Sequence, residues 1–450
     1  MRALDLAQAA LLAARADEAD ALAQVERSGL ARFAGSRVHQ PTLVTNESVS
    51  IRLVRDGRVG TAATNRTDPD GLQALVDRAA AAADRSPADP GFPGLPARVK
   101  IPEVEGWDSD TAALPPSEQA DRAWAAISAV NGFGAFGYFT SGEVETAVAS
   151  TTGIAAAQSS TDADVLVIAA SEDASGFAEA TSWKAGELDS EAVACEAAEK
   201  AARTRGSGGI DPGTYRAVLE PYAIGELLWY FAFSSLGALA FLEGRSYLSG
   251  RLDEAIFDPA FSLFDDGLDP GGLPRAFDFE GVPKQRVTLV DAGIAKDVVW
   301  DRRTAGRAGR ESTGHALPPS QQAFGPVPFN LSLEPGDATV DELVEGVEDG
   351  IYVTRLHYLG VVDPREGIIT GMTRDGTFRI EGGRVTRPLG NLRFSTSFPK
   401  LAHDLVGLGH EPKLVNLNDY YDERHAFGAL VPALATAAFT VVGVGSSPGF

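Results

Sequence analysis

The most apolar stretch of the chain runs from Leu219 to Gly250 and predicts a central helix. Pro221 suits the first helical turn, where its missing N–H leaves no intrahelical hydrogen bond unmade. From Tyr222 to Leu242 only one glutamate and two serines are plainly polar, and a helix that is apolar nearly all round lies in a large core or in a membrane. Glu226 would be costly in a bilayer, and the flanks carry no basic cluster. We therefore expect a buried helix at the centre of the protein and no membrane partner.

Before this helix, strand patterns alternate with helix patterns. Polar and apolar residues alternate from Val49 to Leu53, and Arg55-Asp56-Gly57 supplies the residues that a hairpin turn needs. Asp68 can cap a helix whose apolar residues recur on one face. The expected strands cover 21–33, 42–61, 161–170 and 176–184, and the expected helices cover 68–84, 117–130 and 190–203. These patterns predict an α+β N-terminal domain, residues 1–205, with a mostly antiparallel sheet and helices on one side.

Beyond the central helix, strands and long loops predominate. Two strands are expected around the turn Asp291-Ala292-Gly293, and a meander follows with turns at Asp375-Gly376 and Glu381-Gly382-Gly383. An apolar strand or strand pair is expected over 431–444. Gly206 to Gly209 is a natural linker. We therefore predict a second, β-rich domain over 210–450, entered by the buried apolar helix.

Composition narrows the class of protein. At 450 residues, two or three domains are expected, and 44% hydrophobic with 22% charged residues are globular values. The formal net charge of −23 argues against a nucleic-acid partner. Asp5 and Gln8 interrupt any apolar core of a secretory signal. A cytoplasmic protein is therefore expected.

Three short motifs suggest chemistry that their surroundings do not support. Gly132 to Gly137 reads G-x-G-x-x-G, but a dinucleotide-binding loop needs a strand before it and a helix after it, and here the expected order is reversed. Asp265 to Asp269 suggests a calcium loop, yet the position that needs glutamate holds Ala276, so a solvated acidic turn is expected. Gly445 to Gly449 matches the nucleophile elbow, but only Phe450 remains where a helix must follow.

The number and spacing of the cysteine and histidine residues do not match a common metal-binding motif. The single Cys195 excludes an internal disulfide framework and a Cys-rich zinc module, and we expect it as a small buried residue of a helix. No two of the six histidines are three to five residues apart, as ligand pairs usually are. Two alternatives stay open for the late group, convergence on a metal or a set of surface histidines in a polar loop. The group comprises His403, His410 and His425, with Glu411, Asp419 and Asp422 nearby.

The order and spacing of several motifs resemble one family. In the second half they are Glu280-Gly281-Val282-Pro283, Asp291-Ala292-Gly293, Asp301-Arg302-Arg303-Thr304-Ala305, Ser312-Thr313-Gly314-His315-Ala316, Glu348-Asp349-Gly350-Ile351-Tyr352-Val353, Ile380-Glu381-Gly382-Gly383 and Pro388-Leu389-Gly390-Asn391. In the first half, Asp56-Gly57-Arg58-Val59-Gly60 and Thr64-Asn65 precede a helix. Together they resemble the TldD/PmbA (TldE) family of bacterial metallopeptidase-like proteins over nearly the whole chain.

The resemblance implies a peptidase architecture with paired subunits that enclose a chamber for unfolded or small peptides. It also implies that the active branch carries H-E-x-x-x-H on the central helix, where two histidines bind zinc and the glutamate acts as general base on the metal-bound water. Aligned on the family motif, those three positions fall at Trp229, Tyr230 and Ser234. No histidine lies between His39 and His315, and the further ligating cysteine of that branch would fall near Arg424.

The resemblance therefore implies the TldE/PmbA-like branch, a metal-free subunit with no catalytic residue and no cofactor of its own. Zinc is expected in a TldD-like partner that bears the motif, and a peptide is the expected substrate. Two alternatives remain, namely a non-catalytic homodimeric peptide-binding or scaffold protein and a peptidase in its own right. Each chamber residue that we select could equally hold a loop by a local hydrogen bond. The selected residues are Arg245, Tyr247, His315, Tyr352 and Asn391.

Overall fold

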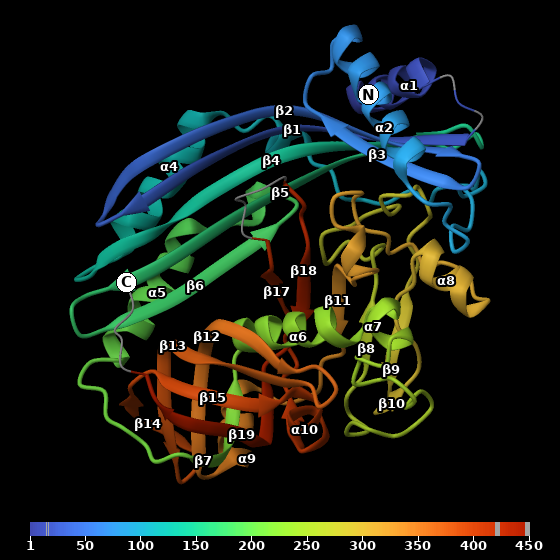
Figure 1. The fold of residues 1–450 in the computed structure, drawn as a ribbon. Coiled ribbons are helices and arrows are strands. Elements are labelled where there is room, and N and C mark those ends of the chain that lie inside the picture. Colours follow the sequence, from blue (N-terminus) through green and yellow to red (C-terminus); the bar gives the residue numbers. More distant parts are fainter. Residues whose placement is uncertain (15, 17, 419–423, 446–450) are drawn as a thin grey trace.

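The computed structural model describes residues 1–14, 16, 18–418 and 424–445. A long, curved sheet arches over a β-rich region, and the central helix lies between them (Figure 1). The first part of the chain contains α1 (Arg2–Ala14), β1 (Glu18–Ala34), β2 (Arg37–Arg55), β3 (Arg58–Thr64), α2 (Pro69–Arg85), α3 (Ser109–Ala112), α4 (Pro116–Ala129), β4 (Gly134–Ser150), β5 (Ala155–Ala170), β6 (Ser175–Ser182), the 3₁₀ turn η1 (Ala185–Glu187) and α5 (Ser190–Arg203).

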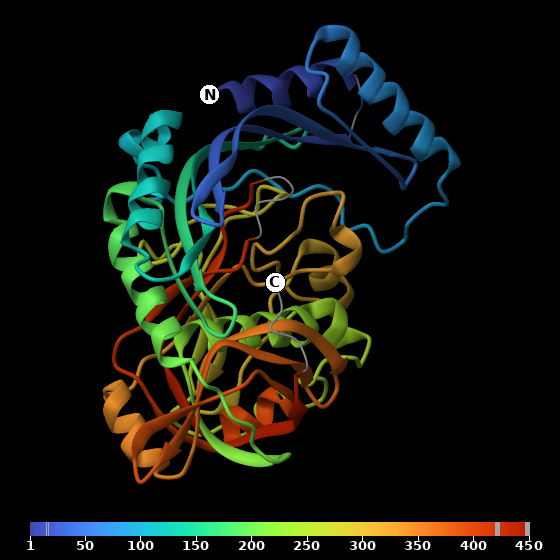
Figure 2. The same cartoon turned by 90° about the vertical axis from the view of Figure 1, so that its left-hand side faces the viewer.

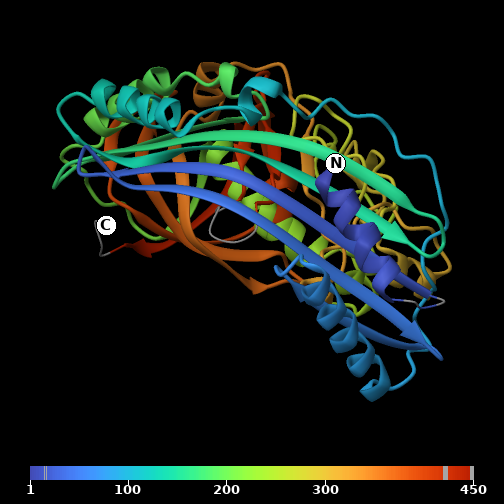
Figure 3. The same cartoon turned by 90° about the horizontal axis from the view of Figure 1, so that it is seen from above.

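The curved sheet has six strands in the order β3-β2-β1-β4-β5-β6, and every neighbouring pair is antiparallel. Helices α1, α2, α4 and α5 all lie on its outer side (Figures 2 and 3). Two apolar clusters join them to the sheet, one beneath α1 and α2 and one beneath α4 and α5. The predicted α+β fold, with an antiparallel sheet and helices on one side, is confirmed.

Local sequence signals explain several of these elements. Asp56 and Gly57 turn the β2–β3 hairpin at φ values of 48° and 71°, and Asp68 caps α2 by accepting a hydrogen bond from the Gly71 N–H at 2.9 Å. Helix α5 has the predicted bounds. The expectation that Cys195 is buried is wrong, because it is exposed, whereas Ala194, one residue before it on the helix, faces the sheet.

The second part of the chain contains two sheets and several short helices. Its elements are β7 (Gly213–Leu219), α6 (Pro221–Ser235), α7 (Ala238–Leu242), β8 (Leu263–Asp265), β9 (Val287–Asp291), β10 (Ile294–Ala295), α8 (Arg302–Ala308), η2 (Gln322–Phe324), β11 (Asn330–Leu333), α9 (Val340–Val347), β12 (Gly350–Asp363), β13 (Ile368–Glu381), β14 (Arg384–Leu389), β15 (Leu392–Ser397), α10 (Phe398–His403), β16 (Leu405–Leu408), β17 (Lys413–Asn416), β18 (Gly428–Val431) and β19 (Leu434–Val444). The predicted boundary at residues 205 to 210 falls between α5 and β7.

One of these sheets closes into a small barrel. Its path runs β12-β7-β19-β15-β13, and β12 pairs again with β13, while β14 and β16 lie beside β13 and β19. The other sheet has the order β10-β9-β8-β11-β18-β17. The predicted β-rich character of this part is confirmed.

The predicted central helix is buried but shorter than expected. Helix α6 ends at Ser235, and Leu236 and Gly237 separate it from α7. A Cβ added to Gly237 would lie 2.2 Å from the Pro326 carbonyl oxygen, so the loop packs against this break. Leu227, Leu228 and Phe231 are fully buried in the largest core cluster. In the described part of the chain, no helix has both the length and the apolar character to cross a membrane.

One expected turn and one expected linker have different structures. Asp375 and Gly376 lie inside β13, where both have positive φ and the pairing with β12 shifts. The turn residues therefore form an irregularity within a strand. Gly208 donates its N–H to Pro388 and accepts from Gly390, which ties the expected linker to β14. The Gly445–Gly449 motif lies, apart from Gly445, outside the described residues.

Candidate functional site between the sheet and the central helix

Much of the inner face of the curved sheet is polar although it is buried. Along each strand, side chains alternate between the helix-covered face and this one. The buried polar and charged side chains of the inner face are Asp20, Gln24, Ser28, Arg52, Thr140, Asp162, Asp164, Glu179 and Thr181. Ion pairs join it to the second part of the chain, from Arg52 to Glu280 at 2.7 Å and from Arg424 to Asp162 at 2.6 Å. Function is therefore expected where this face meets the second part.

The three positions implied for a zinc motif share one face of α6. Ser234 lies one turn after Tyr230, and Trp229 directly precedes Tyr230, so the three span a broad side of the helix. All three are partly buried, whereas the opposite side forms the core. The Trp229 ring lies 5.0 Å from that of Phe427 and 6.4 Å from that of Phe329, centroid to centroid. The Ser234 hydroxyl donates to the Tyr230 carbonyl at 2.9 Å.

These side chains do not fit a zinc ion. The Trp229 indole N–H is only a donor, and Ser234 is committed to the backbone of its own helix. Burial raises the pKa of the Tyr230 phenol, which disfavours the phenolate that a metal would need. Zinc is bound in proteins by thiolate, imidazole and carboxylate, and none of the three residues carries such a group. These three positions of α6 therefore supply no ligand set for zinc.

One turn earlier on α6, a carboxylic acid faces the same region. Burial raises the pKa of Glu226 to about 8, with Glu179 and Asp375 adding repulsion against the attraction of Arg355. Within the described residues its buried Oε2 has no hydrogen-bond partner. Near neutral pH this group is largely protonated, so it can donate a hydrogen bond as well as accept one.

A second acidic feature lies on the inner face of the sheet. Asp164 of β5 and Glu179 of β6 are both buried, and their carboxyl groups interact with each other. Burial and the neighbouring Glu179 raise the pKa of Asp164, and burial raises the pKa of Glu179 to about 7. Two carboxyl groups this close cannot both ionise easily, so the pair holds a proton at neutral pH. Arg355 and Lys413 supply the compensating positive charge.

Tyr352, one of the predicted chamber residues, belongs to a hydrogen-bond network at the N-terminus of α6. Its hydroxyl donates to Glu220 at 2.8 Å, and Lys200 binds the other Glu220 oxygen at 2.6 Å. Next to it, the Tyr222 hydroxyl bonds the backbone N–H and C=O of Glu179. Tyr352 is 9% exposed. Its contacts are those of a residue that joins β12 to α6.

Arg245 and Tyr247 follow α7. Arg245 is exposed and pairs with Glu243 at 2.6 Å. The Tyr247 ring packs beside Phe231, at 6.2 Å between centroids, and Arg251 lies 4.2 Å from its centroid. The partners named here for Arg245 and Tyr247 do not include Asp164 or Glu179.

His315 is placed in a closed cluster, and its hydrogen-bond partners are Asp265 and Thr313. Its Nε2 bonds Asp265 at 2.7 Å and its Nδ1 bonds Thr313 at 2.9 Å. Burial, with the nearby Lys284, lowers the pKa of His315, so it is neutral at physiological pH. The expectation of a solvated acidic turn is wrong for Asp265, which is fully buried and also accepts from the Asn330 N–H. The tertiary partners of Asp265 are far from it in sequence.

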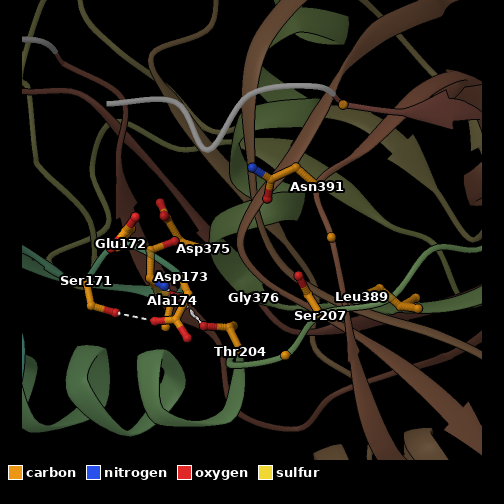
Figure 4. A pocket seen from close by; sticks show the side chains of 14 residues that line it. Ser171, Glu172, Asp173, Ala174, Thr204, Ser207, Asp375, Gly376, Leu389 and Asn391 are labelled. Atoms are coloured by element: carbon orange, nitrogen blue, oxygen red, sulfur yellow. Dashed lines mark hydrogen bonds between the residues drawn. The ribbon is translucent and has the colours of Figure 1, made fainter.

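Asn391 borders a polar cavity of about 460 Å³ beside the tip of the β5–β6 hairpin of the curved sheet (Figure 4). The tip of the β5–β6 hairpin supplies Ser171, Glu172 and Asp173, and β13 supplies Asp375. Asp375 is 2% exposed and paired with Arg355 at 2.8 Å. The cavity therefore lies between the sheet and the barrel, close to the acidic groups described above.

The late histidines each have a separate neighbour. His403 bonds Asp404 at 2.9 Å, His410 bonds the Ala338 carbonyl at 3.0 Å, and the ring of His425 lies 5.3 Å from that of Phe279. Asp419 and Asp422 lie outside the described residues. Within the described ranges, no group of three or more His, Cys, Asp and Glu side chains could hold a metal ion.

Two family models match most of the chain. The model described as the PmbA/TldA metallopeptidase C-terminal domain matches residues 212–443, and the model described as PmbA/TldA metallopeptidase domain 1 matches residues 19–83. The chain belongs to the PmbA/TldD metallopeptidase family. The motifs of the second half thus predicted the family correctly.

Curated relatives of this family member carry metalloprotease names. A protein of Methanothermobacter thermautotrophicus named metalloprotease is 30% identical over 50% of this chain and 49% of its own length. A protein of Saccharolobus solfataricus named zinc metalloprotease TldD homolog is 28% identical over 41% of each chain. The matched region thus spans about half of each relative or less.

Solved structures share the whole fold at low sequence identity. The crystal structure of TldE from Thermococcus kodakarensis has a TM-score of 0.87 at 18% identity and covers 98% of this chain and 99% of that one. A putative modulator of a DNA gyrase from Thermotoga maritima has a TM-score of 0.83 at 21% identity, covering 94% and 96%. At this identity the likeness establishes the fold alone.

Proposed function

We propose that this family member is a metal-free, TldE/PmbA-like subunit that works with a TldD-like subunit bearing H-E-x-x-x-H in a cytosolic peptidase. One observation carries the proposal. The face of α6 on which the resemblance places two zinc ligands and a general base presents Trp229, Tyr230 and Ser234. An indole and a backbone-bonded hydroxyl cannot replace two imidazoles.

The metalloprotease names of the relatives fit this division of labour. A relative with that name would correspond to the zinc-bearing partner, whereas this chain would shape the chamber and bind peptide. The buried polar face of the sheet supports a binding role, because such groups are costly to bury unless they bond a partner. A homodimer of this chain that binds peptide without cleaving it is the alternative.

Zinc content and reconstitution together test the proposal. The chain is purified alone, without chelator, and its zinc is measured by elemental analysis. It is then mixed with the H-E-x-x-x-H homologue of the same organism, and cleavage of an unfolded peptide is followed by mass spectrometry. We expect near-zero zinc in the isolated chain, a stable complex, and cleavage that requires both chains and stops with a chelator.

A matched control is a partner in which the glutamate of its motif is replaced by glutamine, which should assemble but not cleave. About one zinc per isolated chain, the occupancy of a dedicated site, would overturn the metal-free assignment. The scaffold alternative would be favoured if the zinc-free chain binds peptide as a homodimer and forms no complex with the homologue.

A further inference from the structure

Two arginines stand opposite each other on the face of the barrel that is turned toward the curved sheet. Arg355 of β12 is paired in register with Arg374 of β13, so both side chains lie on one face. The Arg355 guanidinium lies 3.9 Å from the centre of the Phe177 ring of β6. Figure 1 shows β12 and β13 beneath β6. Two positive charges therefore lie side by side between the barrel and the sheet.

One carboxylate is shared by both arginines. The Arg355 Nη1 donates to Asp375 Oδ2 at 2.8 Å, and the Arg374 Nε lies 3.9 Å from the same oxygen. Like charges directly opposite each other on neighbouring strands are destabilising, and a single carboxylate offsets only one of the two. One row further along this face, the exposed Arg393 of β15 lies opposite Met372 and adds a third positive charge. Positive charge is therefore in excess on this face.

The acids on the neighbouring elements do not remove this excess. Glu226 of α6 and Glu179 of β6 both interact with Arg355. Burial raises the pKa of Glu226 to about 8 and that of Glu179 to about 7, so near neutral pH each carries less than a full negative charge. Lys413 shares in compensating Glu179. Arg374 is therefore the least compensated charge of the group.

The neighbouring His357 indicates the sign of the local potential. It lies two residues after Arg355, on the same face of β12. Burial, together with Arg374 and Arg355, lowers the pKa of His357 to about 4 against the opposing effect of Asp375. The two arginines thus outweigh the carboxylate at this position, and a further positive charge is disfavoured there.

A ligand can reach the two guanidinium groups. The side chains of Arg355 and Arg374 are 13% and 15% exposed. Within the described part of the chain no hydrogen bond engages the Arg374 side chain, and its nitrogens keep some accessible surface. The polar cavity of about 460 Å³ adjoins the pair, since Asp375 lines it (Figure 4). Glu172 and Asp173 also line this cavity but are exposed, so solvent screens their charge.

We propose that Arg355 and Arg374 together bind one carboxylate, which accepts hydrogen bonds from the unused N–H groups of both guanidinium groups. The forked donors of arginine match the two oxygens of a carboxylate. The free C-terminus of a peptide or one of its acidic side chains carries such a group. Assigning the carboxylate to a peptide rests on the proposed function, whereas the preference of the site for a carboxylate does not.

Isothermal titration of the isolated chain at low ionic strength tests this, with N-acetylalanine and its uncharged amide as probes. We expect the acid to bind about tenfold more tightly or better, because hydrogen bonds to a charged group contribute about that factor. The chain carries a formal net charge of −23, so non-specific attraction would not favour an anion. Equal affinity for both probes, or no binding of the acid at about 10 mM, well above a millimolar dissociation constant, would overturn the proposal.

The variant Arg374→Met removes the least compensated charge. Asp375 keeps its hydrogen bond from Arg355, so the fold should be retained. We expect about a tenfold loss of N-acetylalanine affinity or more. The matched control Arg384→Met removes an exposed arginine at the β13–β14 turn and should bind as the native chain does. Unchanged affinity in Arg374→Met, or an equal loss in both variants, would contradict the assignment.

A second pair of variants keeps the test decisive if Arg374→Met does not fold. His357 is only half-buried, and His357→Glu places a carboxylate on the same face, where it would occupy the unused N–H groups of the arginines. His357→Gln introduces a side chain of nearly the same size without the charge. We expect N-acetylalanine binding to be lost in His357→Glu and kept in His357→Gln. Binding that persists in His357→Glu, or an equal loss in both, would place the anion elsewhere.

Three N-acetylated pentapeptides then distinguish a C-terminus from an acidic side chain. One has a free C-terminal carboxylate and no acidic side chain, and the other two are C-terminal amides with glutamate or glutamine at the centre. Tighter binding of the first identifies a C-terminus, and tighter binding of the glutamate peptide identifies a side chain. Exclusion of all three while N-acetylalanine binds would contradict only the assignment to a peptide. Zinc content and partner assembly are measured separately, so failure of the proposed function remains distinguishable.

Discussion

The two faces of the curved sheet are built from alternate residues of the same strands and yet have opposite chemistry. On the outer face, Ala163 and Phe139 pack under helices with no exposed surface. On the inner face, their neighbours Asp162 and Thr140 bond a residue of the distant C-terminal part, Arg424. A strand period of two thus puts an apolar core and a polar interface one residue apart.

The difference between the two faces distinguishes residues that mainly stabilise the fold from residues that are better explained by function. The outer face needs only close packing of small side chains against helices. The inner face buries charges, which is rarely the most stable solution, because desolvation opposes the Coulomb attraction. The inner face is therefore the part of the sheet whose buried charges function explains better than stability does.

Breaking the buried ion pair of the inner face should have the largest effect. Arg424 donates from Nε and Nη2 to the two oxygens of Asp162 at 2.7 and 2.6 Å, with both side chains 3% exposed. Arg424→Met should lower the free energy of unfolding by about 3–5 kcal/mol, because it removes the ion-pair partner of a buried carboxylate. Urea denaturation followed by circular dichroism measures the loss.

The matched controls are an exposed pair and a double variant. Arg245→Met removes the exposed partner of Glu243 and should cost at most about 1 kcal/mol. Asp162→Leu combined with Arg424→Met should recover much of the loss, since apolar residues often replace a buried pair without cost. A loss below 1 kcal/mol in Arg424→Met (roughly the value of an exposed pair) would mean that the inner face is open to water.

On the outer face, adding one methyl group should disturb helix packing. A Cβ at Gly176 of β6 would lie 2.1 Å from the Ala197 carbonyl oxygen and 2.3 Å from the Ala201 nitrogen of α5. Gly176→Ala should therefore lower stability by about 1–3 kcal/mol, because backbone must move. Gly186→Ala, which meets no atom within 4 Å, should change stability by less than about 0.5 kcal/mol. Equal effects in the two variants would refute the close contact.

The acidic groups predict a particular pH dependence. The folded pKa of Glu226 is about 8, above its ordinary value of 4.5, so between these values the folded protein holds a proton that the unfolded chain has released. Stability should therefore fall as pH rises from about 5 to 8 and then level off. Glu179, at about 7, acts in the same direction.

Glu226→Gln isolates this contribution. Relative to the native protein, the variant should gain on the order of 2 kcal/mol of stability between pH 5 and pH 9, because an amide does not ionise. Urea denaturation at several pH values gives the difference, with the exposed Glu311→Gln as the control. A stability difference that stays constant across this range would show that Glu226 titrates normally.

The smallest effect is expected at Cys195, on the solvent side of α5. Because the thiol is exposed, the folded protein should react with a disulfide reagent to the extent of one thiol per chain. Cys195→Ser should leave stability within about 0.5 kcal/mol of the native value. A thiol that reacts only after denaturation would restore the original expectation of burial.

Much of the architecture could be read from local patterns. The cap Asp68, the turn at Asp56-Gly57 and the helix from Ser190 to Arg203 were all predictable, because caps, turns and helical periodicity depend on residues a few positions apart. The end of α6 was not. Leu236 is apolar and continues the helical pattern, but its carbonyl accepts from the Val299 N–H, and Gly237 packs against the Pro326 carbonyl.

The candidate site was predictable only in part. Family motifs pointed to the face of α6 that carries Trp229, Tyr230 and Ser234, but not to the buried carboxyl groups of Asp164 and Glu179. One signal was present, since Asp162 and Asp164 interrupt a run of strand-forming residues at the spacing of a single face. Without partners in view, such residues are indistinguishable from the solvated face of an edge strand.

The sequence by itself therefore determined the order of strands and helices, the burial of the central helix and the family. The order of elements and the burial of the helix follow from hydrogen bonding and periodicity within short segments, whereas the family was indicated by the resemblance of several motifs. Only the tertiary structure decided which polar groups meet. Arg424 and Asp162 are 262 residues apart, and Arg52 and Glu280 are 228 apart. Whether a charge is paired or left with a free oxygen depends on packing between such distant segments, which no local pattern encodes.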